Sequence, residues 1–364
     1  MERPTVGVEE EFLVVDERGH LSYEGGDLAA ADVDDGELQR ELVSCQVEVT
    51  TPVCADATEV RERLAELRGE VAANAHAKGL RLVPSGTPVL AQSEQPEITR
   101  KSRYQRIAEW YGDLALTSNT CGCHVHVGMP DRATGIAVSN RVRAWLPVLL
   151  AMSANSPFQH GRDTAYHSWR YLLWNRWPTA GPPPVFDSLD HYDSSVDAMT
   201  RAGAMLDGNM VYWDIRLSDH QPTLEFRIAD IMATADETAL IAGLVRGLVS
   251  TALDEAGSSQ DTPVPLEVLR ANLWRAARTG LAGETLHPVS GALVPVWSQV
   301  ADLVDHVRPA LRADGDMDVV ESGVAALRAA GGGATRQRDS WARRRRLVDV
   351  VDSLALPVGT AAGE

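Results

Sequence analysis

Five stretches of this chain alternate apolar residues with carboxylate, imidazole or guanidinium residues, and this alternation most constrains the fold. A β-strand turns every second side chain to the same face, so each stretch predicts a strand with one apolar and one ionisable face. The stretches are residues 5–15, 42–50, 121–128, 211–218 and 223–230. The sequence therefore predicts an antiparallel sheet that packs its apolar face against a core and leaves its charged face open.

The open face is expected to carry an unusual selection of side chains, namely Glu9, Glu11, Glu48, His124, His126, Arg216, Glu225 and Arg227. For any single strand, a solvated polar face is the simpler interpretation, but all of them together favour convergence on one site. Facing carboxylates repel one another and raise one another's pKa unless a cation lies among them. Oxygen ligands with an occasional imidazole suit Mg²⁺ or Mn²⁺ better than zinc. The sequence therefore predicts a divalent cation site.

Arginines beside such a cation indicate phosphate. Arg216 and Arg227 can hold phosphate oxygens in a fork geometry, and a hard cation with arginines is how enzymes neutralise a transferring phosphoryl group. Neither a P-loop nor a Rossmann glycine motif occurs, so the cation is expected to hold the nucleotide phosphates. The glycines at 331–333, which precede Arg336 and Arg338, indicate either a connection between helices or a loop that covers phosphates.

Charge and composition exclude several classes of function. The formal net charge of -17 repels nucleic acid and anionic membranes, so neither is expected as a partner. The basic run at 343–346 lies in a helical pattern, which indicates a solvated helix face. The apolar stretch at 146–151 is far shorter than the ~20 residues that span a bilayer. The sequence shows no signal-peptide pattern and no CxxC pair, so we expect a cytoplasmic protein. We expect one domain over residues 1–364.

Several motifs, in this order and spacing, resemble the type 2 glutamate-cysteine ligase family, within it the YbdK-like carboxylate-amine ligases. They are Gly7-Val8-Glu9-Glu10-Glu11-Phe12, Glu48-Val49-Thr50-Thr51-Pro52, Cys121-Gly122-Cys123-His124-Val125-His126-Val127-Gly128, Ser153-Ala154-Asn155-Ser156-Pro157-Phe158, Thr223-Leu224-Glu225-Phe226-Arg227 and the glycine-rich segment with Arg336-Gln337-Arg338. The resemblance covers nearly the whole chain.

The resemblance implies an α+β fold like the glutamine synthetase catalytic domain, with a curved, mainly antiparallel sheet of about six strands and helices on its convex face. Helical periodicity at 60–71, at about 137–153, at 240–248 and through most of the last 100 residues agrees with this expectation. The resemblance also implies a reaction. A carboxylate attacks the γ-phosphate of ATP in the presence of Mg²⁺ or Mn²⁺, an acyl phosphate forms, and an amine displaces phosphate to give an amide.

Carried over position by position, the resemblance implies three groups of site residues. The implied metal ligands are Glu9, Glu11, Glu48, His124 and Glu225. The implied catalytic cations are Arg227, which stabilises the phosphate, and Arg216 and Arg170. The implied cofactor contacts are Asn155, His126, Arg336 and Arg338. Two alternatives stay open, because His126 could be an ordinary strand histidine and Asn155 could cap the end of its helix.

Some features leave the substrates open. Gln159, Ala165 and Ala229 replace the Trp, Gly and Cys that the family pattern leads us to expect, and they bear on the acceptor amine. Glu10, on an apolar face, either pairs with a buried arginine or joins the metal site. The expected substrates are glutamate or a related carboxylate and cysteine or another amine. A homo-oligomer is the one protein assembly considered. The alternative functions are a metal-dependent amidohydrolase and a non-catalytic binder of nucleotide or amino acid.

Overall fold

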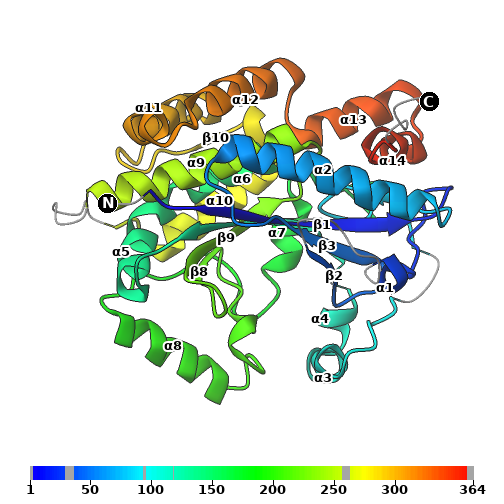
Figure 1. The fold of residues 1–364 in the computed structure, drawn as a ribbon, viewed down its shortest axis with the longest axis horizontal. Helices are drawn as coiled ribbons and strands as arrows, with labels where there is room; N and C mark the ends of the chain where they lie inside the picture. Colours follow the sequence, from blue (N-terminus) through cyan, green and yellow to red (C-terminus); the bar gives the residue numbers. More distant parts are fainter. Residues whose placement is uncertain (1–2, 29–36, 93–95, 118, 256–262, 359–364) are drawn as a thin grey trace.

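The computed structural model describes residues 3–28, 37–92, 96–117, 119–255 and 263–358. A 7-stranded sheet forms its centre, with the order β2-β3-β1-β5-β9-β8 and with β4 paired to the far end of β1 (Figure 1). All of its pairings are antiparallel. The strands are β1 Val6–Val15, β2 Glu37–Arg40, β3 Gln46–Thr50, β4 Arg81–Val83, β5 Gly122–Gly128, β8 Ile215–Leu217 and β9 Thr223–Asp230. This sheet confirms the predicted α+β fold class.

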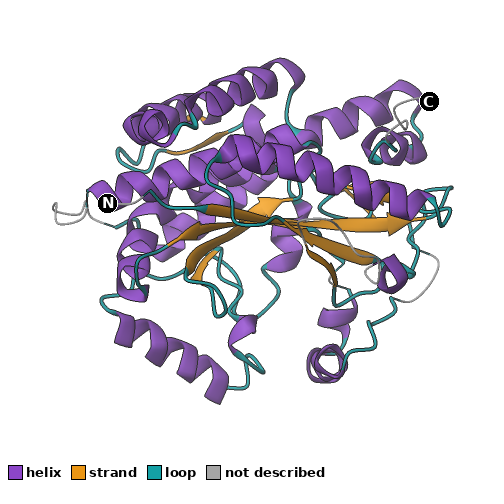
Figure 2. Ribbon diagram, viewed as in Figure 1, coloured by secondary structure: helices purple, strands orange, loops and turns teal. Residues whose placement is uncertain are grey.

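Long helices cover one face of the sheet, and the opposite face stays open toward shorter segments (Figures 1 and 2). The covering helices are α2 Ala57–His76 and α9 Ala235–Asp254, with α11 Val296–Asp314 and α12 Met317–Ala330 packed on α9. The other helices are α1 Gly25–Leu28, α3 Ser102–Tyr111, α4 Asp113–Leu116, α5 Arg132–Val142, α6 Leu146–Ser153, α7 Trp169–Trp174, α8 Leu189–Arg201, α10 Leu266–Thr279, α13 Gly333–Arg344 and α14 Leu347–Leu354. Two short hairpins, β6 Phe158–Gln159 with β7 Arg162–Asp163 and β10 Glu284–Leu286 with β11 Leu293–Pro295, complete the described strands. Within the described ranges, no helix is both long and apolar enough to cross a membrane.

Side-chain caps explain where the covering helices begin. The Asp56 carboxylate accepts the Glu59 amide at 2.9 Å before α2, and the Thr234 hydroxyl accepts the Glu237 amide at 3.2 Å before α9. The predicted single helix over 137–153 is wrong, because a 3-10 turn, Arg143–Trp145, separates α5 from α6. Pro147 explains the break, since proline lacks an amide donor and is tolerated in the first turn of a helix.

Two strands are shorter than predicted. β3 begins only at Gln46, because the Ser44 amide donates to the Glu97 carbonyl at 2.9 Å, outside the main sheet. β8 is reduced to Ile215–Leu217 within the predicted stretch 211–218. The phase of the alternation is nevertheless as predicted, since Val8, Glu10 and Phe12 are 0% exposed on the face that the helices cover.

Glu10 pairs with a buried arginine, one of its two expected roles. Arg68 of α2 donates to the Glu10 carboxylate at 2.7 Å from Nε and 2.6 Å from Nη2, and Thr238 of α9 donates its hydroxyl at 2.5 Å. Arg68 also donates to the main-chain carbonyl of Met232 at 3.0 Å. This network ties β1 to both covering helices, beneath the strand that carries Glu9 and Glu11.

Replacing Glu10 with glutamine is expected to lower the free energy of unfolding by about 2 kcal/mol, because hydrogen bonds to a charged group contribute roughly 1.5–3 kcal/mol. Urea unfolding at neutral pH measures the change. A matched control is Asp193→Asn, which removes the carboxylate from the exposed pair with Arg132 and should change stability by less than about 1 kcal/mol. Equal effects of the two substitutions would contradict the role of the buried network.

Candidate active site on the open face of the sheet

The register of the strands brings the ionisable residues into one row across the open face. Side chains of directly paired residues on one face of an antiparallel sheet lie side by side. The pairs are Glu11 with Glu48, Glu9 with His124, His126 with Glu225, and Glu225 with Arg216. Residues that are up to 216 positions apart in the chain numbering therefore become neighbours, as Glu9 and Glu225 illustrate.

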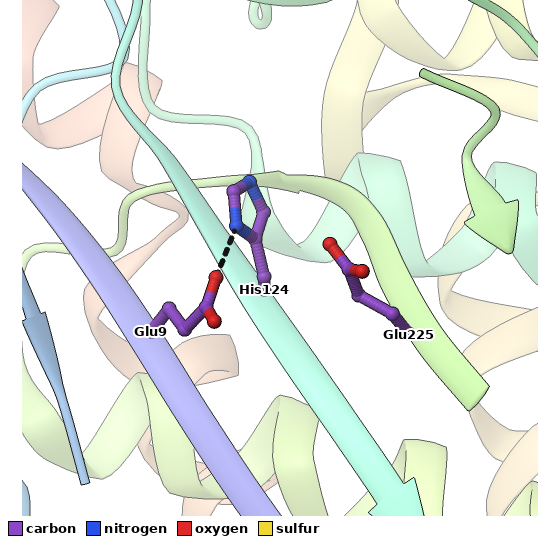
Figure 3. Close-up of side chains that lie close together, drawn as sticks. All are labelled: Glu9, His124 and Glu225. Atoms are coloured by element: carbon purple, nitrogen blue, oxygen red, sulfur yellow. Dashed lines mark hydrogen bonds and ion pairs between the residues drawn. The ribbon is translucent and has the colours of Figure 1, made fainter. Parts of the chain in front are cut away.

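The centre of this row can hold cations. One oxygen or nitrogen atom from each of Glu9, His124 and Glu225 lies within 4.8 Å of the others, and the same is true of Glu11, Glu48 and His124. Figure 3 shows the first of these triads, with its side chains rising from β1, β5 and β9. His124 belongs to both triads, and its Nδ1 lies 2.9 Å from a Glu9 oxygen. Its buried Nε2 has no hydrogen-bond partner among the described residues and is available as a ligand.

The charges around the triads fit a bound cation. Burial, and then the charges of Glu9, Glu41 and Glu11, raise the pKa of Glu48 well above its usual value. Burial also opposes the ionisation of Glu9, but the hydrogen bonds and charges of His124 and His126 outweigh it and lower the pKa of Glu9. A cation among these carboxylates would favour their ionised forms. The donor set of carboxylates and one imidazole is typical of Mg²⁺ or Mn²⁺ sites.

Glu41 is a candidate site residue that the sequence reasoning missed. It lies between β2 and β3, outside any alternating stretch, so no strand pattern pointed to it. Burial and the charge of Glu11 raise the pKa of Glu41 to about 7. Glu41 lines the same cavity as Glu11 and Glu48, and this position makes it a candidate sixth ligand.

Two arginines bracket Glu225 at one end of the row. Arg216 donates to the Glu225 carboxylate from Nε at 2.6 Å and from Nη2 at 3.1 Å, and Arg227 donates from Nη1. Burial alone would raise the pKa of Glu225, but Arg227 and Arg216 lower it below its usual range. The buried Nε of Arg227 has no hydrogen-bond partner among the described residues. Arg216 also donates from Nη1 to the carbonyls of Asn209 and Val211. Among the described residues at this end of the row, Arg227 is therefore the arginine that offers a free donor to an oxyanion.

Two cavities meet the row from different sides. The larger, of about 310 Å³, is lined by Glu9, His126, Arg216 and Glu225, together with residues of the β1 and β3 ends. The smaller, of about 160 Å³, is lined by Glu11, Glu41, Glu48, His124 and Arg227 and by the aromatic residues Tyr104, Trp174, Trp177 and Tyr212. The candidate cation ligands thus lie where the two cavities approach each other. His126 is part of this arrangement, since its Nε2 lies 3.2 Å from a Glu9 oxygen.

Arg170 and Asn155 lie beneath the site. Arg170 is 2% exposed and lines neither cavity in the part of the chain that the structure describes. Asn155 is 1% exposed, and its amide donates to the carbonyls of Pro84 at 2.9 Å and Ile231 at 2.8 Å. The structure does not bring either side chain into the row of carboxylates, so their roles in catalysis and ATP binding stay predictions.

Arg336 and Arg338 are engaged elsewhere. The glycines at 331–333 form the connection between α12 and α13, which is one of the two expected interpretations, and both arginines lie near the start of α13. Arg336 lies 2.5 Å from a Glu237 oxygen, and Arg338 donates to Asp163 at 2.7 and 2.9 Å. Contact of these arginines with ATP likewise stays a prediction.

The three departures from the family pattern do not line either cavity. Ala229 is buried in β9 opposite Cys123, and the Gln159 amide lies 2.9 Å from the His160 ring. Ala165 adopts a positive φ of 64°, a conformation that glycine adopts more readily. The expectation that these positions bear on the acceptor amine is therefore not supported by direct contact with the site.

Sequence comparisons match nearly the whole chain. The family model described as "Glutamate-cysteine ligase family 2(GCS2)" matches residues 5–352. "Putative glutamate--cysteine ligase 2-1" of Rhodococcus jostii (strain RHA1) is 49% identical over 356 residues, covering 97% of this chain and 96% of the relative. "Putative glutamate--cysteine ligase 2-2" of Mycobacterium sp. (strain KMS) is 47% identical, covering 97% of this chain and 98% of the relative.

Solved structures share the fold. A crystal structure of glutamate–cysteine ligase from Francisella tularensis in complex with AMP aligns with a TM-score of 0.70 and 13% identity, covering 97% of this chain and 88% of that chain. A bifunctional glutathione synthetase from Pasteurella multocida aligns with a TM-score of 0.69 and 13% identity, covering 97% of this chain and 52% of that chain. These alignments support the α+β architecture.

Proposed function

Because this chain belongs to glutamate-cysteine ligase family 2, we propose that it is an ATP-dependent carboxylate–amine ligase. It joins glutamate, or a related carboxylate, to cysteine or another amine through an acyl phosphate. The relatives carry names of glutamate–cysteine ligases, and the structural neighbour from Francisella tularensis binds AMP. The names support glutamate as the donor and cysteine as the first acceptor to test.

The observation that carries this proposal is the placement of Arg216 and Arg227 around Glu225, beside the two candidate cation triads. A divalent cation bound by the triads would supply positive charge to the phosphate oxygens of ATP. Arg227 would supply directional donors to the transferring phosphoryl group, and Glu225 would hold that guanidinium in place. An amidohydrolase that activates water needs the cation but has no need of guanidinium groups directed at phosphate.

The two cavities support transfer between two substrates. A phosphoryl group that moves between two oxygens needs its donor and its acceptor roughly in line, on opposite sides. Glu9 and Glu225 line the larger cavity, whereas Glu11 and Glu48 line the smaller one, so substrates in the two cavities would meet at the cation ligands. The chain's own residues would thereby orient the attacking carboxylate and exclude bulk water from the acyl phosphate.

The test is a substrate-dependence experiment. Purified protein is incubated with ATP, Mg²⁺, glutamate and a panel of amines that includes cysteine, and release of ADP and phosphate is followed. We expect ADP release that requires both glutamate and an amine, with formation of a γ-glutamyl amide. Amide hydrolysis without ATP would indicate the amidohydrolase instead, and nucleotide binding without any product would indicate a non-catalytic binder.

Arg227→Lys is expected to reduce turnover nearly as much as Arg227→Ala, by about 3 kcal/mol or roughly 100-fold in kcat. Lysine keeps the charge but is a compact donor, so it loses forked contacts with Glu225 and phosphate. It also loses the planar group that lies 5.6 Å from the Trp174 ring and 5.9 Å from the Tyr212 ring.

Steady-state kinetics with varied ATP and glutamate measure this loss. It should fall on kcat and on kcat/KM for ATP alike, with little change in KM, because the contact strengthens in the transition state. Arg132→Lys, on the exposed surface, is the control and should retain full activity. A lysine variant with near-normal kcat, or with only a raised KM for glutamate, would make Arg227 a substrate-binding charge.

A further inference from the structure

The strand that carries Arg227 contains a β-bulge at the site. Cys123 of β5 pairs with Ala229 of β9, but the next pair along the strands is Val125 with Phe226. Arg227 and Ile228 therefore stand opposite the single residue His124. A bulge removes a strand hydrogen bond and redirects a side chain, and bulges are common beside active sites. Here the bulge lies between a candidate cation ligand and the candidate phosphate-binding arginine.

The backbone of Arg227 finds its partners outside β5. Its amide donates to the Asp214 carbonyl at 2.8 Å, on the side of β8. Its carbonyl accepts a hydrogen bond from Nη2 of Arg170 at 3.3 Å. The opposing Asp214 amide donates to the Gly181 carbonyl, so the Arg227 carbonyl takes its hydrogen bond from the buried Arg170 side chain, as buried polar groups require.

Polar contacts and packing keep Arg170 in that position, although its buried Nε has no hydrogen-bond partner among the described residues. Its amide donates to the Ser156 hydroxyl at 3.0 Å, and its Nη1 lies 4.0 Å from Asp230. Asp230 is itself fixed by the Ser156 and Ser168 hydroxyls at 2.6 and 2.8 Å. The guanidinium groups of Arg170 and Arg227 lie 5.7 and 5.6 Å from the ring of Trp174, so both groups pack against the same aromatic side chain.

Gly122, at the start of β5, leaves the room that Arg170 occupies. A β-carbon built at Gly122 would lie 2.2 Å from Nη2 and 2.7 Å from Cζ of Arg170, so alanine there would displace the guanidinium. The Gly122 amide also donates to the Glu11 carboxylate at 2.5 Å. Arg170 therefore packs at once against the strand that carries His124 and against the bulge that carries Arg227.

We propose that Arg170 is a positioning residue, whose guanidinium holds the β9 bulge and so sets the direction in which the Arg227 side chain enters the site. The proposal rests on the proposed function for its kinetic consequence. Arg170 would then act through Arg227 without touching the substrates, in agreement with its burial and its absence from the described lining of both cavities.

The first test is a double-mutant cycle between Gly122 and Arg170. We expect Gly122→Ala and Arg170→Met each to lower kcat about 100-fold, the size of effect produced by a misplacement of about 1 Å, with little change in KM for ATP. If both act by moving the same guanidinium, the double variant should lose no more than Arg170→Met alone. Independent losses that multiply to about 10,000-fold would overturn the proposal.

The second test asks whether Arg170 acts through Arg227. In an Arg227→Ala background, Arg170→Met should lower kcat only a little further, since the group that it positions is already gone. A further loss of about 100-fold would mean that Arg170 acts by another route and would overturn the proposal.

Arg143→Met is the matched control. Arg143 is 1% exposed and donates to the carbonyls of Pro183 at 3.0 Å and Val264 at 2.7 Å, away from the site. Arg143→Met and Arg170→Met should both lower the unfolding temperature, but Arg143→Met should leave kcat of the folded protein unchanged. An equal loss of kcat in the control would reduce the effect of Arg170 to general destabilisation and overturn the proposal.

The outcomes separate this proposal from the proposed function. If the wild-type protein releases no ADP with any carboxylate and amine, the proposed function fails. The free energies of unfolding then test whether Gly122 makes room for the Arg170 guanidinium. Gly122→Ala should destabilise the wild-type protein but not the Arg170→Met variant. Equal destabilisation in both backgrounds would overturn it.

Discussion

In excess EDTA, glutamate-dependent release of ADP is expected to fall to background, and added Mg²⁺ or Mn²⁺ is expected to restore it. The reason is the charge of the site, where Glu9, Glu11, Glu48 and Glu225 approach one another around His124. A cation relieves the repulsion among these carboxylates and allows phosphate oxygens to approach them. The carboxylates alone would repel ATP.

Thermal unfolding without nucleotide tests the same site independently of turnover. A cation that binds only the folded protein should stabilise it by about 2.7 kcal/mol at 100 times its dissociation constant, which raises the unfolding temperature. EDTA saturated beforehand with Mg²⁺ is the control and should have no effect. Full activity in excess EDTA, together with an unchanged unfolding temperature, would contradict the predicted cation site.

Glu225→Gln is expected to lower kcat by about 1000-fold, or roughly 4 kcal/mol, the upper end of the effect of removing one preorganised group. Glu225 combines two roles, since it belongs to a cation triad and also holds Arg216 and Arg227. Glutamine keeps the shape but loses the charge that both roles need. Glu48→Gln should also lose most turnover, because Glu48 belongs to the second triad.

The two substitutions should have opposite effects on the stability of the metal-free protein. Burial alone would raise the pKa of Glu225, but the charges of Arg227 and Arg216 outweigh burial and lower that pKa. Ionised Glu225 therefore stabilises the folded protein at neutral pH, and this stabilisation is lost only as the pH falls through the lowered pKa. Glu225→Gln should therefore destabilise the protein, by about 3 kcal/mol, because two buried arginines lose a counter-charge. Burial and neighbouring carboxylates instead raise the pKa of Glu48, so ionising Glu48 costs stability as the pH rises. Glu48→Gln should unfold at a higher temperature than the metal-free wild type.

Unfolding of both variants at pH 7 in EDTA, with kinetics in Mg²⁺, checks this pair of predictions. Asp193→Asn is the surface control and should change stability by less than about 1 kcal/mol and leave kcat unchanged. A Glu225→Gln variant with normal turnover would take that residue out of the site. Equal destabilisation by the two substitutions would contradict the expected stabilisation of ionised Glu225 by Arg216 and Arg227.

The faces of the strands could be predicted from the sequence because strand geometry has a period of two residues. Glu9 and Glu11 share the open face of β1, as predicted, and Glu10 points to the helices. The identity of the Glu10 partner could not be predicted. Arg68 comes from α2, and the approach of that helix depends on packing over the whole sheet.

Motifs did not by themselves show where the residues outside the strands lie. Asn155, Arg336 and Arg338 belong to motifs of the family pattern, but the structure does not place their side chains in the row of site carboxylates. Asn155 donates to the Pro84 carbonyl, Arg336 pairs with Glu237, and Arg338 pairs with Asp163. Glu41 belongs to no alternating stretch and yet lines a cavity of the site. A motif indicates that a segment matters, but the path of a connection determines where its side chains point.

By itself, the sequence determined the kinds of side chain on the open face, and from these it predicted a site for a cation and phosphate. Local geometry sufficed, since alternation acts between residues two positions apart. Only the tertiary structure decided that Glu11 meets Glu48, that Glu9 meets His124, and that a bulge opposite His124 is held by Arg170. These pairings join segments far apart in the chain, and their register depends on burying every apolar face at once, a condition that no single segment contains.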